Sequence, residues 1–122
     1  MEKFKANDNK NEEHEINYRQ FNKKLELLNQ ILSLISDINQ AADEKEVKDC
    51  IPALLQYIGE YTDADRVYIF ELMSEKQDYY SNTFEWCREG IVPQIDNLIR
   101  ISADSMPVWH EKFLRGEAII IH

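Results

Sequence analysis

The stretch "RVYIFEL", residues 66–72, decides the fold of this chain. Its β-branched and aromatic side chains are typical of a strand, and apolar residues occupy both of its alternating faces. We therefore expect a central strand that is covered by helices on at least one side. The polar turn "MSEKQD" separates this strand from "YYSNTFEWC", residues 79–87, which predicts a second strand in a hairpin or meander with the first.

Downstream of the two strands, the sequence predicts an irregular excursion, a short helix and a third strand. The excursion carries Pro93 and follows no regular period. Asp104 or Ser105 is a candidate cap for a short helix that tolerates Pro107 in its first turn. The apolar run "AIIIH", residues 118–122, predicts a third strand. The expected fold class is therefore α+β, an antiparallel sheet with flanking helices.

Upstream of residue 66, apolar residues at alternating steps of three and four predict a long helix over residues 18–41. Two stripes share this helix: one comprises Tyr18, Phe21, Leu25, Leu28, Leu32 and Ile35, and the other Leu27, Ile31, Leu34, Ile38 and Ala41. Such a helix is about 36 Å long, more than a small domain easily covers. We therefore expect one stripe to pack on the domain. The first stripe, represented by Phe21, Leu25, Leu28, Leu32 and Ile35, is then a dimer interface. The alternative is that both stripes bury against one core.

The remaining boundaries follow from charge and capping signals. Residues 1–17 are rich in charge and offer little to bury, so we expect a disordered tail. Asp43 and Glu46 fit a capping box at the start of a second helix, and Pro52 inside that helix should kink or divide it. The domain itself is expected to span residues 42–122.

Composition excludes several functional classes. The 122 residues carry a net charge of −9, which disfavours nucleic-acid binding. No apolar run approaches the ~20 residues of a membrane span, so we expect a cytoplasmic protein without membrane insertion. The chain has 2 cysteines and 3 histidines, which do not sit at metal-ligand spacing. No metal and no cofactor are therefore expected.

Three segments together carry a family resemblance. "DADRVYIFEL", "NTFEWCREGIVPQIDNL" and "MPVWHEKFLRGEAIIIH" resemble the front part of a GAF domain, of the type found ahead of GGDEF diguanylate cyclase domains and histidine kinases in bacteria. The resemblance covers residues 22–122 and implies an antiparallel sheet with a leading helix that pairs between subunits. It also implies a ligand pocket against one sheet face, with residues 88–117 as its roof. A complete domain of that family continues beyond residue 122, so a truncated sheet is expected. Its unpaired strand edges would be completed by another chain, in a dimer or a swapped assembly.

The function that the resemblance implies is a cytosolic sensor module, without catalysis of its own, that binds a small ligand and forms a homodimer. The parent protein would be a bacterial signalling protein such as a diguanylate cyclase. The candidate ligand-binding residues are Tyr68, Phe70, Trp86, Gln94, Asp96, Asn97 and Trp109. Core packing is the alternative role for the two Trp residues, and turn stabilisation is the alternative for the polar residues of the roof.

Two other functions stay open from the sequence. A GAF-like family reduces methionine sulfoxide with cysteines, and Cys87 beside Arg88 is the candidate thiol for that chemistry. Strand alternation, however, directs these neighbours to opposite faces, and Cys50 is the chain's other cysteine, on a predicted helix. The other alternative is a dimerisation module that binds no ligand.

Overall fold

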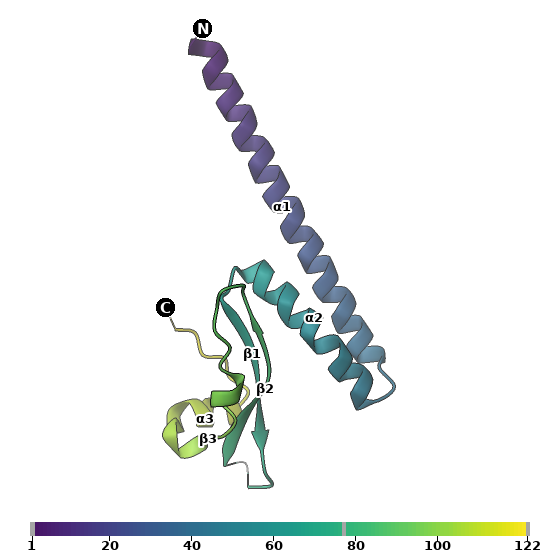
Figure 1. Ribbon diagram of the computed structural model, residues 1–122, viewed down its shortest axis with the longest axis vertical. Helices are drawn as coiled ribbons and strands as arrows, with labels where there is room; N and C mark the ends of the chain where they lie inside the picture. Colours follow the sequence, from purple (N-terminus) through teal and green to yellow (C-terminus); the bar gives the residue numbers. More distant parts are fainter. Residues whose placement is uncertain (1, 77, 122) are drawn as a thin grey trace. The chain divides into compact units, whose positions relative to one another are not determined.

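The computed structural model describes residues 2–76 and 78–121, with side chains described from residue 9 onward. The chain divides into two compact units, one ending at Ala64 and the other beginning at Asp65. The N-terminal unit consists of two helices, and the C-terminal unit holds the sheet and the shorter helical segments (Figure 1). The predicted α+β class, with an antiparallel sheet and a long N-terminal helix, is confirmed.

Helix α1 (Glu2–Gln40) is longer than the sequence predicts. The expected disordered tail over residues 1–17 differs from the structure, because residues 2–17 are helical and only residue 1 lies outside the described residues. Residues 2–17 include several Glu and Lys and one Ala, which have high helix propensity, and neither Gly nor Pro occurs before Pro52. The helical preference of these residues therefore extends the helix well before its first apolar stripe.

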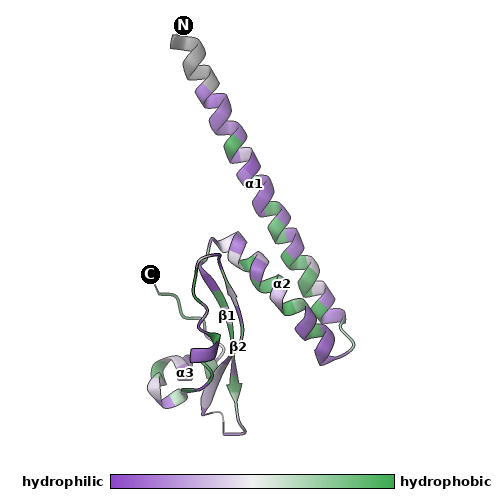
Figure 2. Cartoon of the chain, viewed as in Figure 1, coloured by the Kyte–Doolittle hydropathy of each residue, from purple (hydrophilic) through white to green (hydrophobic). Residues whose placement is uncertain are grey.

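Helix α1 packs against α2 (Glu44–Thr62) in an antiparallel hairpin within the N-terminal unit. Leu27 and Ile31 are buried, and Leu55 and Gly59 are the buried residues of α2. Figure 2 shows hydrophobic colour concentrated in the C-terminal half of α1 and along α2. The stripe that contains Leu27 and Ile31 therefore packs on the protein's own second helix, as one of the two sequence alternatives requires.

The predicted pair Asp43 and Glu46 holds the start of α2, with Asp43 as the N-cap. The Asp43 carboxylate accepts a hydrogen bond from the Glu46 backbone N–H at 2.9 Å, and the Glu46 carboxylate accepts one from the Ala42 N–H at 2.8 Å. The expected division at Pro52 does not occur, since α2 runs through this residue as one helix. Pro52 lies on the exposed side, so its missing N–H costs one helical bond while the buried side of α2 keeps its packing.

The sheet consists of β1 (Arg66–Met73), β2 (Tyr79–Cys87) and β3 (Ile101–Ser102), antiparallel and in that order. The register of β1 and β2 shifts between the pairs Ile69↔Phe84 and Phe70↔Asn82, so Thr83 is an additional residue in β2. This β-bulge reverses the alternation of side chains along β2. Tyr80 and Asn82 therefore face one side of the sheet, whereas Phe84 and Trp86 face the other.

The third strand is not where the sequence predicts it. Residues 118–121 have no regular secondary structure, and His122 lies outside the described residues. Instead β3 pairs with the start of β2, with Tyr80 opposite Ile101, and the Ala103 N–H donates to the Asp78 carbonyl at 2.8 Å. Residues 101 and 102 pair with β2 at this position, so strand-like composition alone does not make residues 118–121 a strand.

Three short helical segments complete the C-terminal unit: η1 (Ile95–Asn97), η2 (Ala103–Ser105) and α3 (Pro107–Leu114). Pro107 is in the first turn of α3, as predicted, but neither Asp104 nor Ser105 caps that helix. The Ser102 hydroxyl caps η2 instead, by accepting a hydrogen bond from the Asp104 N–H at 3.2 Å. The short helix η2 therefore precedes α3 almost directly.

Candidate ligand-binding site

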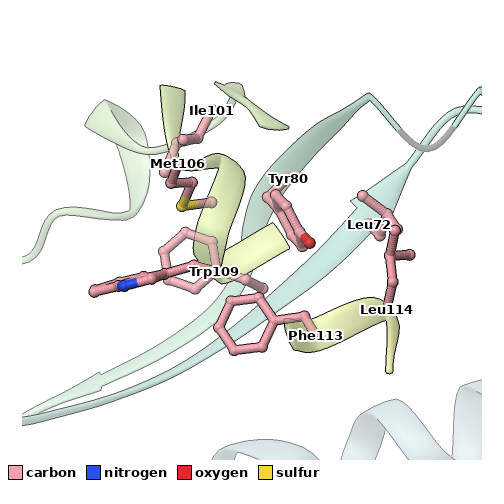
Figure 3. A pocket seen from close by; sticks show the side chains of 8 residues that line it. Leu72, Tyr80, Ile101, Met106, Trp109, Phe113 and Leu114 are labelled. Carbon is pink, nitrogen blue, oxygen red and sulfur yellow. The ribbon is translucent and has the colours of Figure 1, made fainter. Parts of the chain in front are cut away.

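A cavity of about 430 Å³ lies between one face of the sheet and α3 (Figure 3). Every element of the C-terminal sheet and helix α3 contributes to its wall. The lining residues are Phe70, Leu72, Tyr80, Ile101, Met106, Trp109, Phe113 and Leu114. None of these eight side chains carries a formal charge, and seven are wholly apolar or aromatic without a hydroxyl.

Strand register and helical spacing bring these side chains together. Leu72 of β1 pairs with Tyr80 of β2, which pairs in turn with Ile101 of β3, so these three lie side by side on one sheet face. Trp109 and Phe113 are four residues apart on α3, so they share one face of the helix, and both line the cavity. Both aromatic side chains remain more than two-fifths exposed, so the cavity is open to solvent beside them.

The Tyr80 hydroxyl is a polar group of this wall that a neighbouring side chain holds in place. It lies 2.8 Å from Nδ1 of His110, on the next residue of α3 after Trp109. The Tyr80 ring meets the His110 and Phe113 rings edge to face, with centroid distances of 5.7 and 6.1 Å. Since Tyr80 is only 6% exposed, its ring is fixed by packing and its hydroxyl by a hydrogen bond.

The structure brings two of the predicted ligand-binding residues to this cavity. Phe70 and Trp109 line it. Tyr68 lies beside Phe70, with ring centroids 5.5 Å apart, but is not among the lining residues. Trp86 pairs with Val67 and faces the opposite side of the sheet, because the bulge at Thr83 reverses the alternation before it.

The predicted polar residues of the roof do not line the cavity, and two of them, Gln94 and Asn97, make local hydrogen bonds. The Gln94 backbone N–H donates to the Glu85 carboxylate at 2.8 Å, and Asn97 Nδ2 donates to the Gln94 side-chain oxygen at 3.1 Å. Asp96 is exposed within η1. These contacts hold the loop against β2, which is the turn-stabilising role that the sequence left open.

Six lining residues are absent from the set of candidates that the sequence identified: Leu72, Tyr80, Ile101, Met106, Phe113 and Leu114. Alternation from Phe70 points to Leu72, and a step of four from Trp109 points to Phe113. Tyr80 and Ile101 need the register of β2, which a polar turn of this length does not determine.

Cys87 lies at the end of β2, opposite Arg66 of β1. Partial burial raises the pKa of the Cys87 thiol, Glu85 raises it further through a hydrogen bond, and Arg66 opposes both effects. The net direction is upward, so the thiolate is disfavoured at neutral pH. Arg66 itself donates through Nη2 to the Val92 carbonyl at 2.6 Å, so it ties the roof loop to β1.

The predicted dimer-interface residues lie on α1, in the N-terminal unit. Phe21, Leu25, Leu28, Leu32 and Ile35 are all exposed in the single chain. They occupy the stripe that α2 leaves uncovered, since Leu27 and Ile31 supply the buried contacts of the hairpin.

Within residues 2–76 and 78–121, the helices lack the combination of length and apolar character that a membrane crossing requires. In the same described residues, no group of three or more His, Cys, Asp and Glu side chains is placed to hold a metal ion. Comparison of the chain with models of known protein families finds no match, and a search among curated proteins finds none either.

Proposed function

We propose that this chain is a GAF-like sensor module of a cytosolic bacterial signalling protein, such as a diguanylate cyclase. In this proposal the C-terminal unit binds a small apolar ligand, and α1 pairs with a second copy of the chain. The observation that carries the proposal is the cavity of about 430 Å³ between the sheet and α3.

The size and lining of the cavity are those of a binding site. Small-molecule sites occupy roughly 300–1,000 Å³ and are mainly apolar, with a few placed polar groups. Protein interiors, by contrast, are packed closely and contain few voids larger than a water molecule. Trp109 and Phe113 leave apolar surface open at this cavity, and a ligand with an apolar face would cover that surface.

The ligand-binding part of the proposal is tested by a nuclear magnetic resonance titration with naphthalene as the probe. The two Trp residues give separate indole N–H signals. We expect the Trp109 signal to shift saturably, while the Trp86 signal, which reports the opposite face of the sheet, stays in place. Movement of neither indole signal, or equal movement of both, contradicts binding in this cavity.

A pair of variants on α3 sharpens the titration. Phe113 lines the cavity, whereas Val108 is an exposed apolar residue of the same helix that does not. Phe113→Ala should weaken naphthalene binding because it removes an aromatic wall, and Val108→Ala should not. Since both side chains are exposed, neither change is expected to unfold the unit.

The dimer part of the proposal rests on the uncovered stripe of α1. Most helical stability in proteins comes from packing of an apolar face rather than from helix propensity. The heptad spacing of Leu25, Leu28 and Leu32 is that of a seam between two helices. Sedimentation velocity should show a concentration-dependent dimer, and a monomer at all micromolar concentrations contradicts it.

Regulation would follow if ligand binding and helix pairing are coupled. A ligand changes the pairing of α1 only if it binds two arrangements of the protein with different affinity. Hydrogen exchange of the α1 amides, with and without saturating naphthalene, measures this coupling. Unchanged exchange throughout α1 would argue against a sensor and favour a binding module without output.

A further inference from the structure

The cavity combines an aromatic wall with one buried hydroxyl. Phe70, Trp109 and Phe113 supply the aromatic surface, and the Tyr80 ring is the fourth aromatic group of the lining. Figure 3 shows the hydroxyl end of Tyr80 among the lining side chains. Flat aromatic walls make their best contacts with another ring, in offset or edge-to-face geometry.

The Tyr80–His110 hydrogen bond leaves the hydroxyl able to meet one further polar group. A neutral imidazole either accepts at Nδ1 or donates from it, depending on its tautomer. If Nδ1 of His110 accepts at 2.8 Å, the Tyr80 oxygen keeps lone pairs for a ligand donor. If Nδ1 donates, the hydroxyl hydrogen is available to a ligand acceptor. The Tyr80–His110 pair can therefore bind one ligand group, either a hydrogen-bond donor or a hydrogen-bond acceptor.

The same lining is unfavourable to a charged ligand. None of the eight lining side chains carries a formal charge that could compensate a buried carboxylate or ammonium group. Removing an ion from water without an ionic partner costs far more than removing a neutral hydroxyl that finds a hydrogen bond. An uncharged ligand group beside Tyr80 has no such penalty.

We propose that Tyr80, held by His110, is the specificity-determining polar group of this cavity, and that its ligand is an uncharged aromatic molecule with one hydrogen-bonding group on its ring. This inference rests on the proposed function, since it specifies the class of ligand for the same cavity. Tyr80 positions the ligand by its hydroxyl, and His110 acts through Tyr80.

Three probes of one ring system test the inference on the unaltered chain. Naphthalene supplies the rings alone, 2-naphthol adds a neutral hydroxyl, and 2-naphthoate adds a carboxylate. The dissociation constants come from the shift of the Trp109 indole signal. We expect 2-naphthol to bind about two- to tenfold more tightly than naphthalene, the range of one net hydrogen bond. 2-Naphthoate should bind more weakly than both.

Two tyrosine variants assign the effect to the hydroxyl. Tyr80→Phe keeps the ring and should abolish the advantage of 2-naphthol over naphthalene, measured as the ratio of the two dissociation constants within the variant. Tyr79→Phe is the matched control, because Tyr79 is the adjacent residue of β2, pairs with Met73 on the other sheet face, and stacks under Arg100 at 4.0 Å. It should leave all three affinities unchanged.

The outcomes separate the two proposals. If naphthalene binds but 2-naphthol is no tighter, or if Tyr80→Phe retains the 2-naphthol advantage, the inference is wrong and the proposed ligand cavity stands. Equal or tighter binding of 2-naphthoate overturns the inference as well. If none of the three probes binds, the proposed function and the inference both fail. The comparison of probes on the unaltered chain decides the question even if Tyr80→Phe does not fold.

Discussion

Two leucines of α1, one buried and one exposed, test whether one stripe packs on α2 while the other forms the proposed dimer interface. Leu27 is 5% exposed and packs in the hairpin with α2, whereas Leu32 is 55% exposed on the proposed dimer seam. Both residues are leucines in the same helix, so a change to alanine removes the same atoms at each site. Helix propensity changes little and equally in the two variants.

The expected magnitudes differ because the two leucines differ in burial. A buried Leu→Ala change costs about 2–5 kcal/mol, through lost apolar burial and the cavity left behind. Leu27→Ala should therefore lower the free energy of unfolding of the N-terminal unit by an amount in that range. Leu32→Ala should cost less than about 1 kcal/mol within a single chain, since surface substitutions usually have small effects.

The assay is urea unfolding followed by circular dichroism at 222 nm, repeated over a dilution series. Leu27→Ala should shift the midpoint at every protein concentration. Leu32→Ala should shift it only at concentrations where the unaltered chain associates, because dimer formation stabilises the folded state by mass action. Sedimentation of the same samples reports the association directly.

A particular pattern would refute the assignment of the two stripes. If Leu32→Ala costs as much as Leu27→Ala after dilution has removed all concentration dependence, the exposed stripe is packed inside one chain. If neither variant alters the midpoint, the α1–α2 hairpin is not held by the contacts that the structure shows.

Three further predictions concern single residues. Asp43→Ala should lower stability by about 1 kcal/mol, measured by thermal unfolding, because the Glu46 N–H loses its acceptor, and Asp43→Ser should retain most of it. If Ala and Ser behave alike, the cap contributes nothing. In a Cys50→Ser background, the rate of Cys87 alkylation by iodoacetamide should rise with pH around a midpoint above that of the same thiol in urea, because the folded environment raises the Cys87 pKa. The corresponding stability is present below the unfolded pKa of the thiol and is lost as pH rises through the folded one. A folded midpoint below the unfolded one would favour thiol chemistry at this site. Gly116→Ala should cost about 1–2 kcal/mol, since Gly116 follows α3 with φ of 72°, a left-handed conformation that disfavours a Cβ. Gly116→Asn should cost less. Equal stability of the unaltered chain and the two variants would contradict backbone strain at this position.

The helical part of the fold was largely predictable from the sequence because its signals are local. Steps of three and four identified both stripes of α1, and the pair Asp43 and Glu46 identified the start of α2. The start of α1 was not predictable in the same way. Residues 2–17 lack an apolar stripe, so their charge indicated disorder, while their intrinsic helix propensity pointed to the opposite result.

The sheet was predictable in composition but not in register. Both long strands were expected from their β-branched and aromatic residues. The bulge at Thr83 has no Gly or Pro to mark it, and it decides which face Trp86 occupies. The strand-like composition of residues 118–121 was misleading, because a strand also needs a pairing partner, and the described residues 118–121 pair with no strand of the sheet.

The candidate site was predictable only where one element determines it. Phe70 and Trp109, which are candidates through the family resemblance, each lie in one regular element, and both line the cavity. Tyr80 contributes the central hydroxyl, yet its place depends on the β1–β2 pairing and on His110, which lies 30 residues further along the chain. Long-range geometry of this kind does not leave a local pattern.

Because Thr83 is an additional residue, the even-numbered residues of β2 before and after it contribute their side chains to opposite faces of the sheet. Tyr80, before Thr83, lines the cavity, whereas Phe84 and Trp86, after it, lie on the reverse surface. Mutations on the two halves of this strand can therefore accumulate independently: the reverse surface could adapt to a new neighbour while the selectivity of the cavity is inherited unchanged.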